Sequence, residues 1–209
     1  MPTKKELKEN IWLIWKILTL AKECYQYSYY MHKPETPGEL EYLKYSQHFQ
    51  FIRHILWRNT VIELCKLFSK SSGRDKFNIF HFIGKLKKDG HFRSFDVDAT
   101  KITDWESRLD ANKETIEKLL ILRDKVYAHT DRMNKNPDDL TPTFEAVKQL
   151  IDIVENVIQE IYATVFETHA MMETPLFNRN RFDIVKVLAD AKNTRLQPLL
   201  DEIKQRKRE

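Results

Sequence analysis

The sequence predicts an all-α fold, an antiparallel bundle of about five to six helices followed by a C-terminal helical extension. Only four glycines and seven prolines occur in 209 residues, which leaves few turns for a protein built from many short strands. Apolar residues instead recur at steps of three and four over long stretches, as they do on one face of a helix. Short polar segments rich in Pro, Gly, Asn and Asp separate these stretches.

The first helix is expected from Thr3 to about His32. Thr3 and Glu6 have the spacing of a capping box, in which two side chains accept hydrogen bonds from backbone N–H groups of the first turn. The segment KPETPG, residues 33–38, ends this helix. Helical periodicity between these signals is carried by Ile11, Trp15, Leu18 and Lys22.

The second helix is expected to begin at the cap Thr36, with Pro37 in its first position, and to continue to about Lys70. It carries two apolar stripes, which are typical of a central helix that packs on more than one side. These stripes are Trp57, Val61, Leu64 and Phe68 on one face, and Ile52, Ile55 and Ile62 on another.

Shorter helical segments are expected in the middle of the chain. One runs from the cap Asn78 to a stop at Gly90. Thr103 and Glu106 repeat the capping-box spacing and are expected to open the next. Another is expected over residues 112–128, ending in the sequence LLILRDKVYA.

The strongest periodic signal lies between residues 142 and 170. Thr141 is expected to cap this helix, with Pro142 in its first position. The alternating steps of three and four predict a helix that packs in a bundle or a self-association seam. Residues 1–170 are expected to form the bundle domain, and residues 171–209 the C-terminal extension. The stripe consists of Phe144, Val147, Ile151, Val154, Ile158, Ile161 and Val165.

Composition and charge narrow the class of protein. The 35 Lys and Arg residues exceed the 31 Asp and Glu residues by only four, so charge alone does not require a nucleic-acid partner. The densest apolar run, residues 11–20, contains Lys16 and falls short of the about 20 apolar residues that cross a bilayer. Cys24 and Cys65 lie in helical patterns without metal-ligand spacing. We therefore expect no membrane association, no metal, no cofactor and a reducing cytoplasm.

The candidate catalytic groups lie at the end of the helix expected over residues 112–128. Imidazole exchanges a proton near neutral pH, which suits His129 to the role of general acid or base. Arg123 offers a fork of donors that suits phosphate, and Asp124 and Asp131 are placed to orient a ring or hold the arginine. Together these groups are suited to metal-free cleavage of a phosphodiester by an attacking 2′-hydroxyl.

A purely structural role explains the same residues. Cationic side chains near a helix C-terminus bind the last carbonyl groups and complement the helix dipole, for a gain of about 0.3 to 1 kcal/mol. In a straight α-helix, Arg123 and His129 would also lie about 120° apart around the axis. The two would then meet only in a frayed last turn or across two copies of the chain.

The sequence LRDKVYAHTD, residues 122–131, resembles the signature of the HEPN superfamily, in which an Arg, a polar residue and a His four to six residues after the Arg occur together. WRNTVIELCKLF and FNIFHFIGKL resemble the branch linked to bacterial abortive-infection systems. The resemblance covers roughly residues 8–170. It implies a metal-independent ribonuclease whose site forms across a homodimer, although other relatives are non-catalytic binding modules.

From this resemblance we expect a metal-independent endoribonuclease of a bacterial defence or toxin–antitoxin type that cleaves single-stranded RNA or a tRNA loop. Arg123, Asp124 and His129 are the expected catalytic residues. A cognate antitoxin or defence partner is expected as well. The alternative is a non-catalytic helical module that binds a partner protein or a nucleotide. The expected binding residues are Lys125, Tyr127 and Asp131.

Two other segments carry weaker signals. GKLKKDGHFR, residues 84–93, concentrates cations that either contact an RNA backbone or form a solvated face. CYQYSYYMH, residues 24–32, gathers four tyrosines that either stack on bases or pack in a core or interface.

Overall fold

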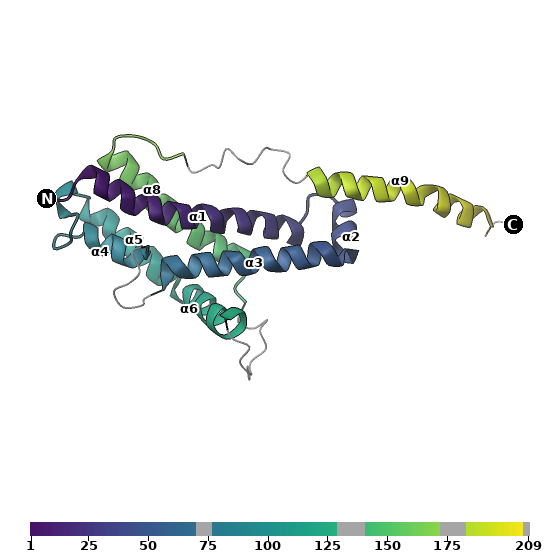
Figure 1. The fold of residues 1–209 in the computed structure, drawn as a ribbon, viewed down its shortest axis with the longest axis horizontal. Coiled ribbons are helices and arrows are strands. Elements are labelled where there is room, and N and C mark those ends of the chain that lie inside the picture. Colours follow the sequence, from purple (N-terminus) through teal and green to yellow (C-terminus); the bar gives the residue numbers. More distant parts are fainter. Residues whose placement is uncertain (70–76, 129–140, 172–182, 207–209) are drawn as a thin grey trace. The chain divides into compact units, whose positions relative to one another are not determined.

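The computed structural model describes residues 1–69, 77–128, 141–171 and 183–206. Within these residues all regular structure is helical, which confirms the predicted all-α class (Figure 1). There are more helices than the sequence predicted, and none of those described is long and apolar enough to cross a membrane. The α-helices are α1 (Lys4–His32), α2 (Pro37–Tyr45), α3 (Gln47–Phe68), α4 (Ile79–Leu86), α5 (Ala99–Ala111), α6 (Lys113–Leu122), α8 (Phe144–Val165) and α9 (Asp183–Arg206), joined by the 3₁₀ helix η1 (Arg93–Phe95) and the π-helix η2 (Arg123–Ala128).

The chain forms two compact units. The first comprises Met1–Cys24 and Arg58–Glu173, and the second comprises Tyr25–Trp57 and Thr174–Glu209. The boundaries fall inside α1 and α3, so each of these helices contributes to both units. The predicted domain division after residue 170 stays a prediction.

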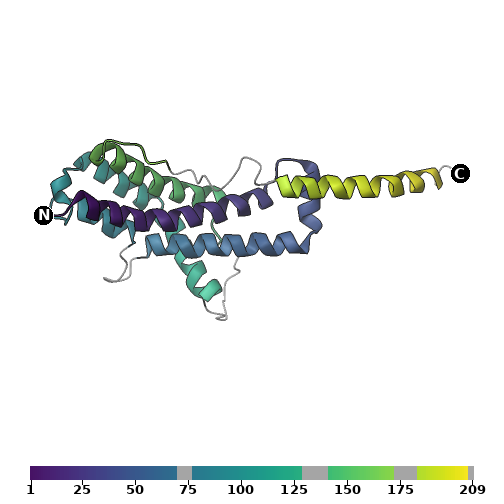
Figure 2. The same cartoon turned by 45° about the horizontal axis from the view of Figure 1, so that its top comes forward.

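Helix α8 supplies much of the core of the first unit. Figure 2 shows it running beside the N-terminal part of α1, where Lys22 Nζ lies 2.8 Å from Glu155 Oε1 and the Trp15 and Tyr162 rings meet edge to face. The predicted stripe is confirmed: Phe144 is half-buried and the other six members are buried. Such burial contributes about 1.5 to 3 kcal/mol for each large apolar side chain. The buried members are Val147, Ile151, Val154, Ile158, Ile161 and Val165.

The predicted second helix is two helices, because the chain bends at Ser46. Thr36 caps α2 as predicted, and Glu39 completes a capping box with it. Ser46 then adopts an extended conformation, with φ −92° and ψ 100°, and its hydroxyl accepts a hydrogen bond from the Phe49 N–H. Serine side chains compete with helical hydrogen bonding in this way, and an uninterrupted apolar pattern conceals the break.

Two predicted helix starts are wrong by a few residues. Asp98, not Thr103, caps α5, and its carboxylate accepts from the Thr100 N–H at 2.8 Å. Thr143, not Thr141, caps α8. In each case two competent capping residues lie close together, and the sequence does not reveal which of them is extended.

The second unit joins α2 to the start of α9. Tyr30, Leu43 and Val185 form its small buried cluster. The Tyr30 hydroxyl donates to Glu39 Oε1 at 2.9 Å, which places a hydrogen-bonded carboxylate within this apolar surrounding. Lys192 Nζ lies 5.8 Å from the ring centroids of both Tyr42 and Tyr45 of α2. These contacts fix the first half of α9 on α2.

Candidate functional site

Helix α6 leads directly into part of the predicted catalytic set. Ile116, Leu119 and Leu122 are buried and fix one face of this helix within the first unit. The thiol of Cys65, on α3, adds a hydrogen bond to the Leu119 carbonyl oxygen at 3.3 Å. The backbone therefore enters the candidate site from an anchored helix.

Arg123 and Asp124 form an ion pair immediately after α6. Arg123 Nε donates to Asp124 Oδ1 at 2.7 Å, and 29% of the Arg123 side chain is exposed. A hydrogen bond through Nε restricts rotation of the planar guanidinium, whose five donors match phosphate oxygens. The geometry agrees with the predicted role of Asp124 in holding the arginine, and the catalytic role of both residues stays a prediction.

The backbone from Arg123 to Ala128 is π-helical. Hydrogen bonds in a π-helix join residues five apart, and such turns occur frequently at functional sites. The expected angle of 120° between Arg123 and His129 assumed an α-helix and does not apply through this turn. Lys125 is exposed within it, whereas the Tyr127 side chain, His129 and Asp131 lie outside the described residues.

Cys65 is a neighbour of the site that the sequence did not reveal. Its thiol is fully buried, and burial raises its pKa to about 12, with Arg123 lowering the pKa and Asp124 raising it to smaller extents. The thiol is thus protonated at neutral pH and is not a nucleophile. The only available signal was its place in the apolar pattern of α3, 54 residues from its hydrogen-bond partner Leu119.

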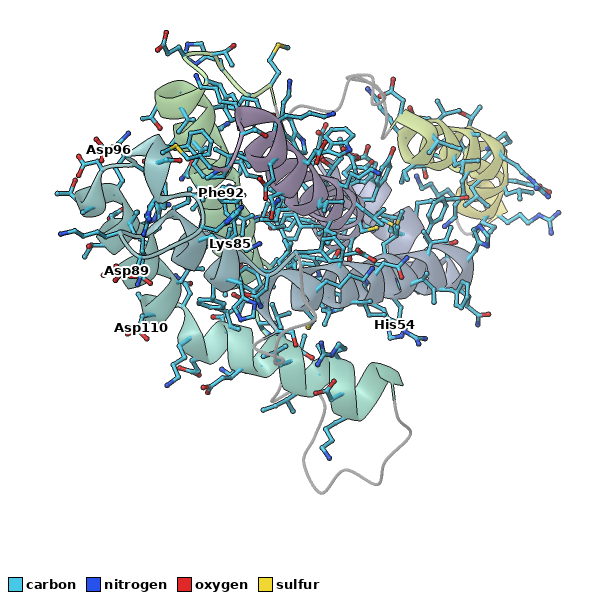
Figure 3. All side chains as sticks on the ribbon, turned by 60° about the vertical axis from the view of Figure 1, so that its left-hand side comes forward. His54, Lys85, Asp89, Phe92, Asp96 and Asp110 are labelled. Atoms are coloured by element: carbon cyan, nitrogen blue, oxygen red, sulfur yellow. The ribbon has the colours of Figure 1, made fainter. Side chains whose placement is uncertain are left out.

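The basic segment after α4 is tied to neighbouring helices. Helix α4 ends at Leu86, before the predicted stop, and a Cβ atom at Gly90 would lie 2.2 Å from the Lys85 carbonyl oxygen, so the turn requires glycine. Lys85 Nζ also lies 6.0 Å from the Phe92 ring centroid (Figure 3). The polar contacts of the segment with α1 and α5 are Lys85 to Asn10, Lys87 to Glu106 and His91 to Glu6.

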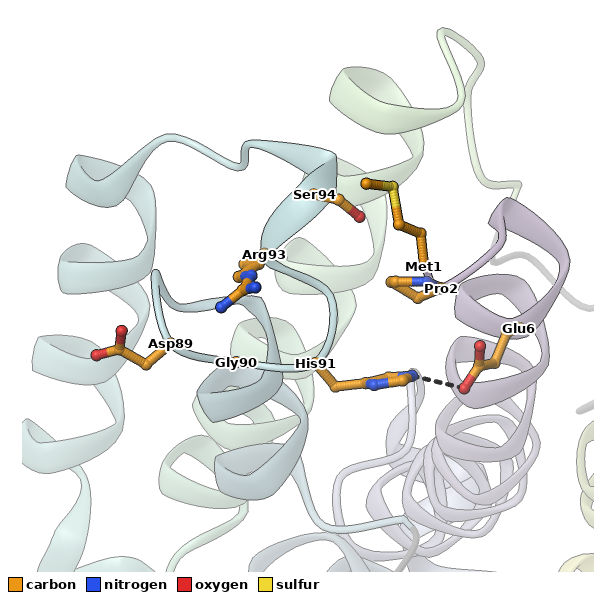
Figure 4. Close-up of a pocket in the computed structure, with 8 residues that line it drawn as sticks. All are labelled: Met1, Pro2, Glu6, Asp89, Gly90, His91, Arg93 and Ser94. Atoms are coloured by element: carbon orange, nitrogen blue, oxygen red, sulfur yellow. Dashed lines mark hydrogen bonds and ion pairs between the residues drawn. The ribbon is translucent and has the colours of Figure 1, made fainter.

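A surface cavity of about 610 Å³ opens beside this segment (Figure 4). Glu6 and Asp89 line it together with His91 and Arg93, and His91 Nε2 lies 2.7 Å from Glu6 Oε1. Carboxylates and basic side chains therefore both line the opening. A wall of mixed sign does not concentrate anionic ligands, so these contacts favour the interpretation of residues 84–93 as a solvated and structural segment.

The tyrosine-rich segment packs within the second unit. Tyr25 and Tyr30 are buried, and the Tyr25 and Tyr29 rings stack with centroids 5.8 Å apart. This favours the packing interpretation over base stacking. Among the described residues, no group of three or more His, Cys, Asp or Glu side chains is arranged to hold a metal ion.

Comparison with known proteins gives one match. Residues 4–181 match the model of a family described as HEPN_AbiU2, AbiU2. The matched segment contains α1 to α8 and all six residues predicted for the site. No curated protein and no solved structure matches the chain.

Proposed function

This chain belongs to the AbiU2 family of HEPN domains, and we propose that it is a metal-independent endoribonuclease of a bacterial defence or toxin–antitoxin type. The observation that carries the proposal is the family match over residues 4–181, which includes Arg123 and His129. The ion pair that restricts Arg123 beside solvent supports it. RNA is the proposed substrate in the cytoplasm, and a cognate antitoxin or defence partner belongs to the same proposal.

The proposed reaction transfers a phosphoryl group within the RNA, from the 5′-oxygen to the neighbouring 2′-oxygen. His129 acts as general acid or base: as base it removes the proton of a 2′-hydroxyl, whose oxygen attacks the adjacent phosphorus while the bond to the 5′-oxygen breaks. The leaving 5′-oxygen takes a proton from an imidazolium. His129 of a second copy of the chain can supply this imidazolium. Arg123 stabilises the charge that develops on the phosphate oxygens, and Asp124 positions Arg123. The products are a 2′,3′-cyclic phosphate and a 5′-hydroxyl.

We propose that the site forms in a homodimer with the segments from Leu119 to Asp131 near the twofold axis. A twofold interface brings identical residues together, which supplies two imidazoles and two guanidinium groups to one substrate. Ile121 supports this arrangement, because it is an apolar residue of α6 that leaves 42% of its surface exposed. Ile121→Glu is expected to disrupt the contact between the α6 helices of the two copies, and therefore to reduce the rate of RNA cleavage.

The decisive experiment incubates the purified protein with total RNA in the presence of a chelator. Wild type is expected to cleave RNA and to leave cyclic-phosphate ends. It is expected not to cleave single-stranded DNA, which lacks the 2′-hydroxyl. His129→Ala is expected to reduce the cleavage rate by about 10² to 10⁴-fold, as is typical for loss of a general acid or base. His91→Ala is the control, because His91 is a histidine outside the predicted site and contacts Glu6 of α1. Cleavage by His129→Ala at the wild-type rate would refute the assignment.

Arg123→Lys tests the arginine separately. A lysine keeps the charge but loses the two-pronged donor geometry, so cleavage is expected to fall although the fold is retained. Arg108→Lys is the control, because Arg108 of α5 also pairs with a nearby carboxylate, Asp104, and is 33% exposed. If neither wild type nor any variant cleaves RNA while the protein binds a nucleotide or partner, the non-catalytic module replaces the ribonuclease.

A further inference from the structure

Helix α9 carries a stripe that is apolar at five of its six positions, and only the first half of the stripe is covered. The stripe advances by steps of four, three, four, three and four, the spacing of a coiled-coil seam. Its first half lies on α2, where Val185 and Ala189 are buried and Lys192 contacts two tyrosine rings. Helix α9 then continues past α2 (Figure 1). The complete stripe is Val185, Ala189, Lys192, Leu196, Leu199 and Ile203.

The second half of the stripe is open to solvent. Leu196, Leu199 and Ile203 are all exposed, with 53% of Leu199 accessible. Pro198 does not obstruct this face, because it lies about 100° from Leu199 and 160° from Leu196 around the helix axis. The face that α2 covers in the first half of α9 thus continues as a seam that none of the described residues covers.

We propose that this open seam pairs with the same seam of a second copy of the chain, in antiparallel orientation. This contact is separate from the twofold contact proposed at α6 and does not depend on ribonuclease activity. In the proposed register, a residue of one copy lies opposite a residue of the other copy when their two residue numbers add up to 395. Leu196 then meets Leu199 of the other copy, and Ile203 lies opposite Lys192, which α2 covers only in part.

The charges flanking the seam select the second copy as the occupant. Arg195 and Glu202 flank the open seam on the same side, and their numbers sum to 397. In the proposed register, Arg195 of one copy and Glu202 of the other are therefore offset by about 3 Å along the helix axis. Two long side chains can span this offset. Twofold symmetry forms this ion pair twice. Glu202 already accepts from Arg206 of its own helix at 2.7 Å, so a second cation would complete a three-charge network.

Orientation follows from the same charges. In a parallel pair, each flanking residue faces a residue five positions along the partner, so Glu202 faces Lys207, whereas Arg195 faces residue 200, a leucine, and gains no ion pair. Only the antiparallel pair places Arg195 opposite a residue of the other sign. The seam is short, so the contact is expected to be weak and concentration-dependent.

The test measures the molar mass of the full chain by light scattering over a range of protein concentrations. Leu199→Glu is expected to remove one self-association step, which halves the limiting mass. Val187→Glu is the control, because Val187 is 62% exposed on the same helix but lies off the stripe. Circular dichroism should show unchanged helix content in both. Wild-type association in Leu199→Glu, an equal loss in Val187→Glu, or a wild type that stays monomeric at hundreds of micromolar would each overturn the proposal.

A charge exchange tests the register. Arg195→Glu and Glu202→Arg are each expected to weaken association, because each places like charges across the seam. The double variant R195E/E202R restores opposite charges in the antiparallel pair and is expected to recover association. Failure of the double variant to recover it would overturn the antiparallel register. Because Ile121→Glu affects only the contact at α6, its effect on mass and cleavage separates failure of the proposed function from failure of this seam.

Discussion

Helices α8 and α9 are similar in length and each carries a stripe with steps of three and four, but the stripe of α8 is the more strongly apolar and the surroundings of the two helices differ. Helix α8, of 22 residues, buries ten side chains in the first unit. Helix α9, of 24 residues, is exposed along most of its described length, and Val185 and Ala189 are its buried apolar residues. Periodicity therefore identifies the face of a helix that seeks a partner, but not whether the chain itself supplies that partner.

The largest effect is expected in α8. Ile158 is fully buried, and Ile158→Ala removes three carbon atoms and leaves a cavity, which costs about 2 to 5 kcal/mol. The free energy of unfolding, measured in urea by circular dichroism, is the readout. A loss below about 1 kcal/mol would show that the core of α8 is not well packed.

An intermediate effect is expected where α9 meets α2. Val185 is buried against Tyr30 and Leu43, and Val185→Ala removes two carbon atoms, for a cost of about 2 kcal/mol. The same urea experiment measures it, and protease accessibility near α2 locates the change. Ile184→Ala is the control, because its neighbour Ile184 is exposed.

The polar anchor in the second unit predicts a pH dependence. Burial of Glu39 raises its pKa, but the hydrogen bonds from Thr36 and Tyr30 together lower the pKa by more than burial raises it. The net pKa of Glu39 therefore lies below the usual 4.5. A carboxyl group with a lowered folded pKa stabilises the fold above its unfolded pKa, and this contribution is lost as pH falls through the folded value.

Glu39→Gln should therefore cost about 1 kcal/mol at pH 7 through loss of its capping interaction. The difference between wild type and variant should shrink below pH 4.5. Urea unfolding at several pH values measures this difference, and a constant difference down to pH 3 would contradict the assignment.

The smallest effect is expected at the open end of α9. Leu199 is half-exposed, so Leu199→Ala should change the unfolding free energy of the isolated chain by less than about 0.5 kcal/mol. The measurement belongs at low protein concentration, where the proposed pairing is absent. A cost like that of Ile158→Ala would mean that the described surroundings of α9 are incomplete.

Local signals in the sequence predicted those parts of the fold that depend on neighbouring residues. The cap at Thr36 and the stripe of α8 are confirmed, because a cap and a helical face are properties of residues close in sequence. The break at Ser46 escaped prediction, since a single serine is compatible with either a helix or a bend. The choice between Asp98 and Thr103 likewise depends on which residue tertiary packing leaves extended.

The candidate site divides in the same way. The contact between Arg123 and Asp124 joins adjacent residues and was predictable. The π-helical turn that follows and the approach of Cys65 were not, because one depends on backbone hydrogen bonds and the other on two helices far apart in sequence. The roles proposed for His129, Asp131 and Tyr127 remain predictions from the sequence and the family.

The two buried cysteines report local opening of the helices that surround them. Cys24 and Cys65 are free thiols in helices α1 and α3, and burial raises the pKa of both. A soluble alkylating reagent at neutral pH consequently reacts with either thiol only when the surrounding helices open. Mass spectrometry of tryptic peptides can time the two openings separately in unmodified protein. Because the Cys65 thiol is hydrogen-bonded to Leu119 of α6, its labelling rate reports how often the helix that leads into Arg123 detaches.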